Sequence, residues 1–382
     1  MLTASAFLIF AQAFMVAPIL PRLAEVFHAD VGVVGLSVPA YLVPYGIVTL
    51  VWGPLADRFG RRPVILVALA SFTLLTAATL TTTSVAGFII WRMAAGAAAS
   101  GVVPVGLALL GDVFAYEERG RAVGWLFGGM AGGMAVGSTA GALAEPTVGW
   151  QGLFAVVAVA GGLLLAAAVV TVPSLPGTSG PASVAAVVRA YAVLLRGSRA
   201  RRTYGYVAFN AVLHSGIYTW LGLYLHQRFG LGPVGVGLGL LGYGIPGFVL
   251  GPFIGRVADR HGRARLIPTG VAVGAVAALG LAAPVPLVVA ALLVALLSLG
   301  YDLTQPLFAG IVTDLPGQRG QAVAFMAVTL FVGFGVGSLV FQAALTLGFT
   351  AALVMFGVGA AIATVAAVPA FADEQAGPRV PV

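Results

Sequence analysis

Residues 53–62 read GPLADRFGRR, and a close copy, GRVADRHGR, stands at residues 255–263. The copies lie 202 positions apart, and Asp112 has a counterpart, Asp314, at the same offset. A repeat of this length indicates a duplicated unit that makes up nearly the whole chain. Further matches at an offset of 200 are RGRA with RGQA (residues 119–122 and 319–322), Gly133 with Gly333, Gly137 with Gly337, and Ser138 with Ser338.

The composition places these repeated units in a lipid bilayer. Of the 382 residues, 60% are hydrophobic and 8% are charged, whereas a soluble domain carries roughly 25% charged residues. A chain with so few polar groups cannot cover a surface that faces water, so we expect its surface to face lipid. The chain has no cysteine, and its four histidines show no metal-ligand spacing. No metal site and no cofactor are therefore predicted.

Apolar runs separated by short polar clusters predict twelve membrane spans. Because each half holds an even number of spans, both halves enter the membrane from the same side and form parallel repeats. The predicted fold is an all-α membrane protein with two six-helix bundles, residues 1–172 and 203–382, joined by a linker at 173–202. The predicted spans are residues 4–24, 33–56, 64–82, 85–110, 122–143, 151–172, 203–226, 234–258, 266–283, 286–310, 322–346 and 350–371.

The arginines predict the orientation of the spans. Between the spans, arginine gathers in the loops that follow even-numbered spans, while the opposite side holds only Arg22 and Arg228. Basic residues collect on the cytoplasmic side of membrane proteins. We therefore expect a multi-pass protein of the plasma membrane with both termini in the cytoplasm. The same bias explains the net charge of +7 without nucleic acid as a partner.

The loop at residues 53–62 resembles the signature loop of the major facilitator superfamily, and the resemblance covers essentially the whole chain. It implies a transporter, usually monomeric, that moves a small solute by alternating access. The loop itself has a physical rationale. Gly53 allows close helix approach, Gly60 allows a tight turn, and Asp57 can meet the positive N-terminus of the eleventh span.

The resemblance further implies that these loops form a gate on the cytoplasmic side. Asp112 is expected to pair with Arg61, and Asp259 is expected to meet the start of the fifth span. Such contacts would latch the two halves together until the protein opens inward. The alternative is that the loops are basic only because they are cytoplasmic. The gate residues are Gly53, Asp57, Arg58, Gly60, Arg61, Arg62, Asp112, Arg121, Asp259 and Arg263.

The fifth span resembles a motif that marks proton antiporters within the superfamily. Where that motif has proline and a final glycine, this chain has Ser138 and Ala142. The alternative is that small residues let two helices pack closely, as in many membrane bundles. The motif residues are Gly124, Gly133, Gly137, Ser138 and Gly141.

Two charged residues stand inside predicted spans, where charge is costly and usually functional. Arg92 begins an R-x-x-x-G motif that in related antiporters is implicated in proton coupling; the alternative is that its side chain reaches the outer surface. Asp302 is the only acid well inside a span. It is predicted to carry a proton or bind a cationic substrate, or else to be a structural carboxylate. Gln305 follows one turn later.

Span seven adds a polar face. Asn210, His214 and Tyr218 are spaced four apart and share one side of a helix, which predicts that they line the substrate site. His214 either titrates near neutrality or is held in hydrogen bonds. Gln12 in the first span is a further candidate.

These features predict proton-driven export of an amphipathic or drug-like compound. One alternative is a symporter or facilitator that imports a nutrient such as a sugar or organic acid. Another is a membrane sensor or scaffold that does not transport, although the short loops offer little surface for a partner. No Walker loop occurs, so ATP-driven pumping is not supported, and the chain is not predicted to be an enzyme.

Overall fold

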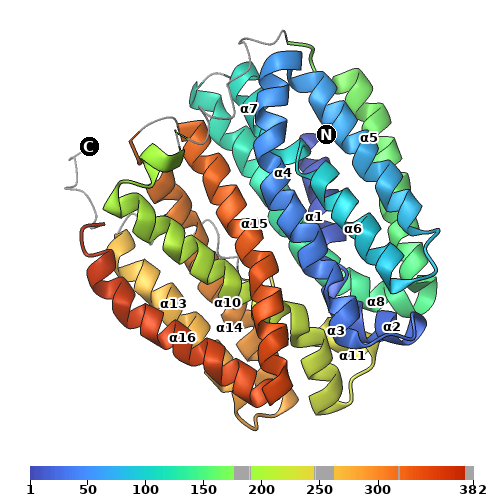
Figure 1. Ribbon diagram of the computed structural model, residues 1–382, viewed down its shortest axis with the longest axis vertical. Coiled ribbons are helices and arrows are strands. Elements are labelled where there is room, and N and C mark those ends of the chain that lie inside the picture. The colour runs from blue at the N-terminus through green and yellow to red at the C-terminus, as the bar shows by residue number, and fades with distance from the viewer. Residues whose placement is uncertain are drawn as a thin grey trace.

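The computed structural model describes residues 1–114, 116–175, 189, 191–244, 246, 262–316 and 319–374, without the side chains of residues 116–120 and 319. In these residues the regular structure is helical, and no strand occurs. The helices gather in two groups that lie side by side, and the N-terminus lies toward the upper end in Figure 1.

The first group runs from the N-terminus to residue 171. Its long helices pack on one another through apolar side chains, as α1 does on α8 and α4 on α6. Its elements are α1 (Leu2–Phe14), η1 (Ala17–Ile19), α2 (Leu20–Val26), α3 (Val31–Gly35), α4 (Ser37–Phe59), α5 (Arg61–Thr79), α6 (Val85–Ala99), α7 (Val102–Val113) and α8 (Tyr116–Thr171).

The second group repeats this packing, because α10 lies on α15 as α1 lies on α8. Its elements are α10 (Ser198–Phe229), α11 (Pro233–Gly239), α13 (Arg263–Ala282), α14 (Leu287–Thr313), α15 (Arg319–Ala344), η2 (Leu345–Leu347) and α16 (Phe349–Ala370). We call the two groups the N-terminal half and the C-terminal half.

Most of the predicted spans map onto these helices, but the first is divided among α1, η1 and α2 and the fourth between α6 and α7. Spans five and six both fall within α8, where two helices meet at a kink at Gly149, whose φ is +69°. Most of the eighth predicted span, beyond Gly244, lies outside the described residues apart from residue 246. In the described residues, nine helical stretches are long and apolar enough to cross a membrane.

Two glycines show why the signature loop recurs in both halves. Gly60 separates α4 from α5 with a φ of +91°, and Gly262 precedes α13 with a φ of +79°. Side chains disfavour this region of backbone conformation, and glycine adopts it freely. Gly60 and Gly262 therefore adopt the same kind of backbone conformation, 202 residues apart.

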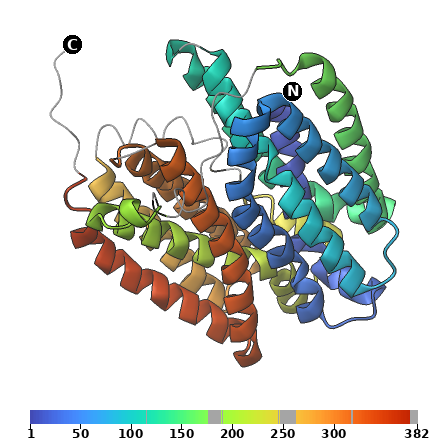
Figure 2. The same ribbon diagram turned by 45° about the horizontal axis from the view of Figure 1, so that its top comes forward.

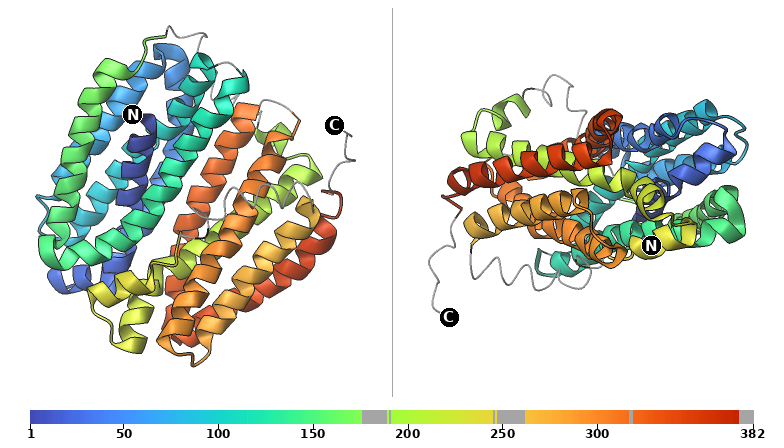
Figure 3. Two further views of the ribbon diagram at one scale, coloured as in Figure 1. Left: turned by 180° about the vertical axis from the view of Figure 1, so that it is seen from behind. Right: turned by 90° about the horizontal axis from the view of Figure 1, so that it is seen from below.

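The halves meet along two pairs of helices. In the first pair α4 packs against α15, and in the second α8 packs against α11. Figure 3 shows the second pair from behind, where α11 reaches under the N-terminal half to lie beside α8. Figure 2 brings forward the end that holds the N-terminus. We call that end the basic face, because the repeated loops place Arg61 and Arg263 there.

Candidate functional site

Arg92 is sealed inside the N-terminal half. Its side chain in α6 is 0% exposed and donates hydrogen bonds to the backbone oxygens of Gln12 (3.0 Å), Ala13 (3.3 Å) and Ser37 (3.3 Å). Its guanidinium lies 4.4 Å from the ring centre of Tyr41, a stabilising cation–π contact. The side chain does not reach the outer surface. Arg92 ties α1, α4 and α6 together.

Gln12 belongs to the same buried cluster. Its side chain is fully buried, donates to Thr76 on α5 at 3.2 Å and approaches Arg92 at 3.5 Å. Gln12 therefore joins the helices of one half together, and a solute cannot reach it in this conformation.

Asp302 on α14 is partly exposed, in contrast to Arg92. Its carboxylate accepts a hydrogen bond from Ser298 at 3.2 Å, and the Ser298 oxygen accepts one from the backbone N–H of Gly244 at 2.9 Å. Tyr243 and Tyr301 lie close enough to interact electrostatically with this carboxylate. Gln305 lies one turn away with its side-chain oxygen buried and unpaired in the described structure.

His214 is held between two backbone carbonyls. Its Nδ1 lies 2.9 Å from the oxygen of Asn210, and its Nε2 lies 2.8 Å from the oxygen of Leu297 on α14. Carbonyl oxygens only accept hydrogen bonds, and a neutral imidazole has only one N–H. Both contacts are hydrogen bonds only when both ring nitrogens carry hydrogen, and only one of them is when the ring is neutral. The ring is also buried, which disfavours its charged form.

The other two residues of the span-seven face are buried with it. Asn210 donates to Thr304 on α14 at 2.8 Å. The hydroxyl of Tyr218 donates to the backbone oxygen of Phe14 on α1 at 3.1 Å, which joins the two halves. The predicted helix face exists, and it points partly toward α14 and partly toward the N-terminal half.

Aromatic rings run between Arg92 and Asp302. Close pairs along this row are Tyr45 with Phe331 at 4.3 Å, Phe14 with Tyr218 at 5.5 Å, and Tyr218 with Tyr243 at 4.3 Å between ring centres. Such rings offer apolar faces together with a few hydroxyls. We call this set the aromatic row: Phe10, Phe14, Tyr41, Tyr45, Tyr218, Tyr243, Tyr301, Phe331 and Phe334.

The halves are joined at the face opposite the basic face. Gln342 on α15 donates to the backbone oxygen of Gly32 at 2.9 Å. Gly35 packs so closely on the indole of Trp220 that a Cβ there would stand 2.9 Å from Cζ2. Trp220 in turn donates to the backbone oxygen of Ser338 at 3.1 Å. We call these contacts the outer clasp.

At the basic face the described ion pairs stay within each half. Arg61 pairs with Asp57 and lies 3.2 Å from Asp112. In the C-terminal half, Arg263 pairs with Asp314 at 2.6 Å. The pairing of Arg61 with Asp112 is the one that the resemblance implies. The half-exposed Asp57 carboxylate pairs with Arg61 of its own half, and among the described residues no hydrogen bond joins it to α15.

The remaining gate residues are less constrained. Arg62 donates to the backbone oxygen of Val169 on α8, and Arg58 lies over the ring of Phe59. Arg121 is exposed. Asp259 lies outside the described residues. The expectation that Gly53 allows close helix approach is wrong here, because no described heavy atom lies within 4 Å of where its Cβ would be.

The glycines of the fifth span pack on α1. A Cβ on Gly133 or Gly137 would overlap the backbone oxygen of Phe7 or Ala11, and one on Gly141 would stand 2.9 Å from the Cβ of Met15. This contact explains why α8 needs small residues on one face. Ser138 is buried among them, whereas Gly124 meets open space.

Sequence reasoning missed an ion cluster that closes the C-terminal half. Glu374, whose side chain is 5% exposed, accepts from Arg199 at 2.6 and 2.8 Å and from Arg202 at 3.2 Å. Arg202 also binds Asp373, and this hydrogen bond lowers the pKa of the Asp373 carboxyl. The sequence did not predict this cluster, because acidic residues in a tail after the last helix usually lie in solvent. We call this cluster the C-terminal clamp.

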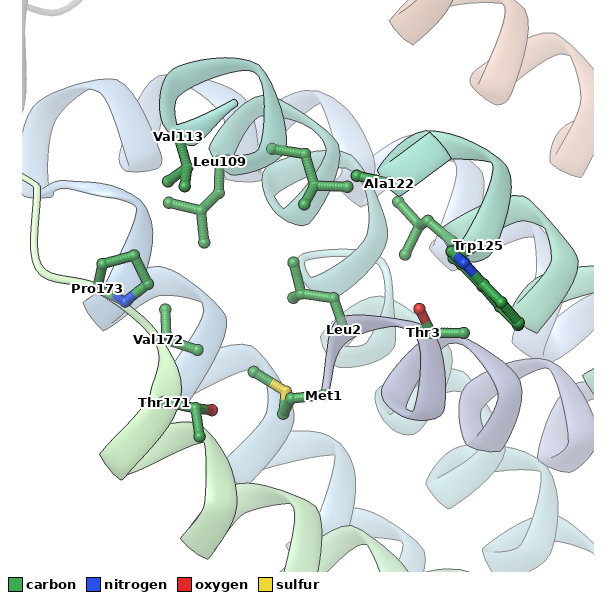
Figure 4. A pocket seen from close by; sticks show the side chains of 12 residues that line it. Met1, Leu2, Thr3, Leu109, Val113, Ala122, Trp125, Thr171, Val172 and Pro173 are labelled. Atoms are coloured by element: carbon green, nitrogen blue, oxygen red, sulfur yellow. The ribbon is translucent and has the colours of Figure 1, made fainter. Parts of the chain in front are cut away.

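A separate pocket lies at the basic face within the N-terminal half. It has a volume of about 360 Å³ and is lined by apolar side chains of α1, α7 and α8, including Leu2, Leu109 and Trp125, as Figure 4 shows. Its lining side chains carry no charge. The pocket is thus chemically unlike the surroundings of Asp302.

Comparison with known proteins shows the family. The profile of the Major Facilitator Superfamily matches residues 2–338 and 235–381. The uncharacterized MFS-type transporter YwfA of Bacillus subtilis is 26% identical over 343 residues, which cover 88% of this chain and 82% of that protein. The multidrug resistance protein MdtM of Salmonella typhimurium is 33% identical over 149 residues, 38% of this chain and 36% of that protein.

Solved structures share the fold at low identity. The D-xylose-proton symporter superposes with a TM-score of 0.79 at 17% identity, over 96% of this chain and 95% of that one. The human organic anion transporter MFSD10 gives a TM-score of 0.70 at 19% identity, over 96% and 98%. With a matching profile and several apolar helices that can cross a bilayer, the chain is a multi-pass membrane transporter of the major facilitator superfamily.

Proposed function

We propose that this transporter exports an amphipathic, drug-like cation across the plasma membrane in exchange for protons, as a monomer with its basic face in the cytoplasm. One observation carries the proposal. Of the two charges inside the membrane region that the sequence singled out, only Asp302 is partly exposed, whereas Arg92 is fully buried under backbone oxygens. A solute between the halves therefore meets a negative charge.

A carboxylate in such surroundings suits exchange. Away from bulk water, the negative charge of Asp302 is costly unless it is neutralised by a proton or paired with a cation. The proton and the cation compete for the same carboxylate oxygens. The tyrosines beside it offer ring faces, which attract organic cations. The apolar rings of the aromatic row would hold the rest of an amphipathic molecule.

His214 supplies a second place for a proton. Its two carbonyl partners favour the imidazolium, while burial among apolar groups opposes it. The ring lies 5.1 Å from that of Tyr301, the neighbour of Asp302. In this proposal a proton on His214 would lie one aromatic side chain away from the segment of α14 that carries Asp302.

The contacts at the two faces fit alternating access. The outer clasp is made, and Asp57 is paired with Arg61 of its own half; we take this to be the arrangement of a protein that faces inward. Opening outward would break the contacts of Gln342 and Trp220 and would bring Asp57 to α15. Relatives named as multidrug proteins or antiporters, such as MdtM, match part of the chain and support export.

The test uses inverted membrane vesicles with an acid interior, read by a pH-sensitive dye. Lipophilic cations such as tetraphenylphosphonium, neutral antibiotics, sugars and amino acids are added in turn. We expect cations to dissipate the gradient only in vesicles that hold the protein, and the Asp302→Asn variant to lose this response. Dissipation by sugars or amino acids alone would overturn the proposal in favour of a nutrient carrier.

A further inference from the structure

Ser298 occupies a junction that neither the motifs nor the comparisons assign. It lies on α14 one turn before Asp302 and is 3% exposed. Its oxygen accepts the N–H of Gly244 at 2.9 Å, and its hydroxyl donates to Asp302 at 3.2 Å. One hydroxyl thus links the carboxylate of the proposed exchange site to the backbone of another element.

The backbone at Gly244 belongs to a break in the helical structure after α11. The helix ends at Gly239, Tyr243 donates its N–H back to Leu240 at 2.8 Å, and Gly244 has a φ of +91°. An N–H at a helix break has lost its helical acceptor and needs another one. For Gly244 this acceptor is the side chain of Ser298.

The other side of the break rests on the N-terminal half. A Cβ on Gly244 would stand 2.6 Å from the Cβ of Ala135 on α8. Ala135 lies two residues after Gly133, on a different side of the helix from the glycines that pack on α1. The antiporter-type segment of α8 is therefore held between α1 and the Gly244 break.

We propose that Ser298 is a positioning residue that transmits the protonation of Asp302 to the Gly244 break and so to the contact between the halves. The proposal rests on the proton exchange proposed above. With Asp302 ionised, the bonds from Gly244 to Ser298 and from Ser298 to the carboxylate polarise and strengthen one another. When Asp302 takes a proton from water, it becomes a poorer acceptor and both bonds weaken.

A weakened bond at Gly244 frees the break to move against Ala135. The halves touch there, so the movement shifts the balance between inward-facing and outward-facing states. Two tyrosines, Tyr243 and Tyr301, lie within electrostatic range of the carboxylate, and His214 packs on Tyr301. These groups set the pH midpoint of the conformational change. The Ser298 hydroxyl determines whether protonation of Asp302 affects the contact with α8.

The test measures conformation directly and needs no substrate. Because the chain has no cysteine, spin labels can be placed uniquely with Thr83→Cys and Thr346→Cys, two exposed positions in the two halves on the side of the outer clasp. Double electron–electron resonance on the purified protein in nanodiscs, between pH 5 and pH 9, gives the fraction of molecules with the clasp open.

In the otherwise unchanged protein we expect this fraction to change with pH around one midpoint, and in Asp302→Asn to stay flat. Ser298→Ala should move the midpoint by about one pH unit, a tenfold change in proton affinity, or reduce the pH-dependent fraction at least twofold. Ser298→Thr restores the hydroxyl and should restore the response, whereas the isosteric Ser298→Val should not.

Thr313→Val is the matched control, because it removes a hydroxyl from the same helix that bonds only the backbone of Gly310. If Ser298→Ala does not fold, the Thr and Val variants make the same comparison. A normal response in both Ser298→Ala and Ser298→Val, with a flat one in Asp302→Asn, would overturn the role of Ser298 alone. A flat response in the unsubstituted protein would overturn proton coupling as well.

Discussion

The two halves share a repeated sequence and the same helix packing, yet they hold their charges differently. In the N-terminal half, Arg92 is buried under three backbone oxygens and the ring of Tyr41. In the C-terminal half, Asp302 is partly exposed and bound through Ser298 to a break in the chain. The first charge fixes helices in place, whereas the second is the one for which we propose an exchange of partners.

The basic face shows a second contrast. Each half pairs an arginine with an aspartate at matching positions, Arg61 with Asp112 and Arg263 with Asp314. Only the C-terminal half adds the C-terminal clamp around Glu374. Among the described residues, the C-terminal half is therefore braced at this end by more ion pairs than the N-terminal half.

The largest effect should come from removing Arg92. Arg92→Ala takes a charged donor from three carbonyls, and each such hydrogen bond is worth about 1.5–3 kcal/mol. We expect the folded state to lose at least about 3 kcal/mol, or the protein to fail to accumulate. Thermal unfolding in detergent measures the loss.

Asp302→Asn is the matched test in the other half. It keeps the size of the side chain and should leave the unfolding temperature nearly unchanged while transport coupled to protons is lost. If instead Asp302→Asn unfolded the protein and Arg92→Ala left it stable, the assignment of a structural charge and an exchanging charge would be reversed.

Substitutions of glycines in α8 and α15 test whether the close helix packing is equivalent in the two halves. A Cβ on Gly137 would overlap the backbone oxygen of Ala11, and one on Gly337 would overlap that of Val212. Alanine at either position should force the helices apart and lower the unfolding temperature by several degrees. Gly124→Ala is the control, because it meets open space and alanine favours a helix by about 1 kcal/mol. Unequal effects at Gly137 and Gly337 would show that the repeated packing is not equivalent.

The outer clasp offers a smaller effect on the balance of states. Gly35→Ala places a methyl group against the buried indole of Trp220 and should shift molecules toward the outward-open form. Spin labels at residues 83 and 346 report the shift as a longer distance. Gly232→Ala serves as the control, since its Cβ meets no atom within 4 Å. An unchanged distance in Gly35→Ala would contradict a role of Trp220 in the outer clasp.

The smallest effect is expected at the C-terminal clamp. Glu374→Gln keeps the shape but removes the charge that faces Arg199 and Arg202, and should lower the unfolding temperature by about 3 °C. The corresponding end of the N-terminal half should be unaffected in hydrogen exchange. Equal loss of protection in both halves would contradict a clamp confined to one of them.

Acid should act on the same clamp. Because Arg202 lowers the pKa of Asp373, this carboxylate stabilises the folded protein above its unfolded pKa, and the contribution is lost as the pH falls through the lowered value. Unfolding temperatures measured on the acid side of neutrality should therefore decline less in Asp373→Asn than in the unsubstituted protein.

Much of the fold could be predicted because its signals are local. Apolar runs mark the helices, and the glycines at residues 60 and 262 mark equivalent turns. Contacts within the site were harder to foresee. That Arg92 is sealed while Asp302 remains reachable depends on how neighbouring helices pack, and the sequence alone shows both as charges inside spans.

The misses have similar causes. Gly53 was expected in a close helix contact, but glycine alone does not tell whether a neighbour is present in a given conformation. Ser298 and Glu374 escaped notice because a lone serine or a tail glutamate carries no motif. Their roles arise from partners far away in the chain, Gly244 for one and Arg199 for the other.

The central claim is that a proton and a cation compete for Asp302. It is tested most directly by adding tetraphenylphosphonium to the purified protein in weakly buffered detergent solution and following the pH. The account predicts that binding releases protons, that the affinity falls as the pH is lowered, and that Asp302→Asn binds without release. Binding that releases no proton, or the same release from Asp302→Asn, would contradict it.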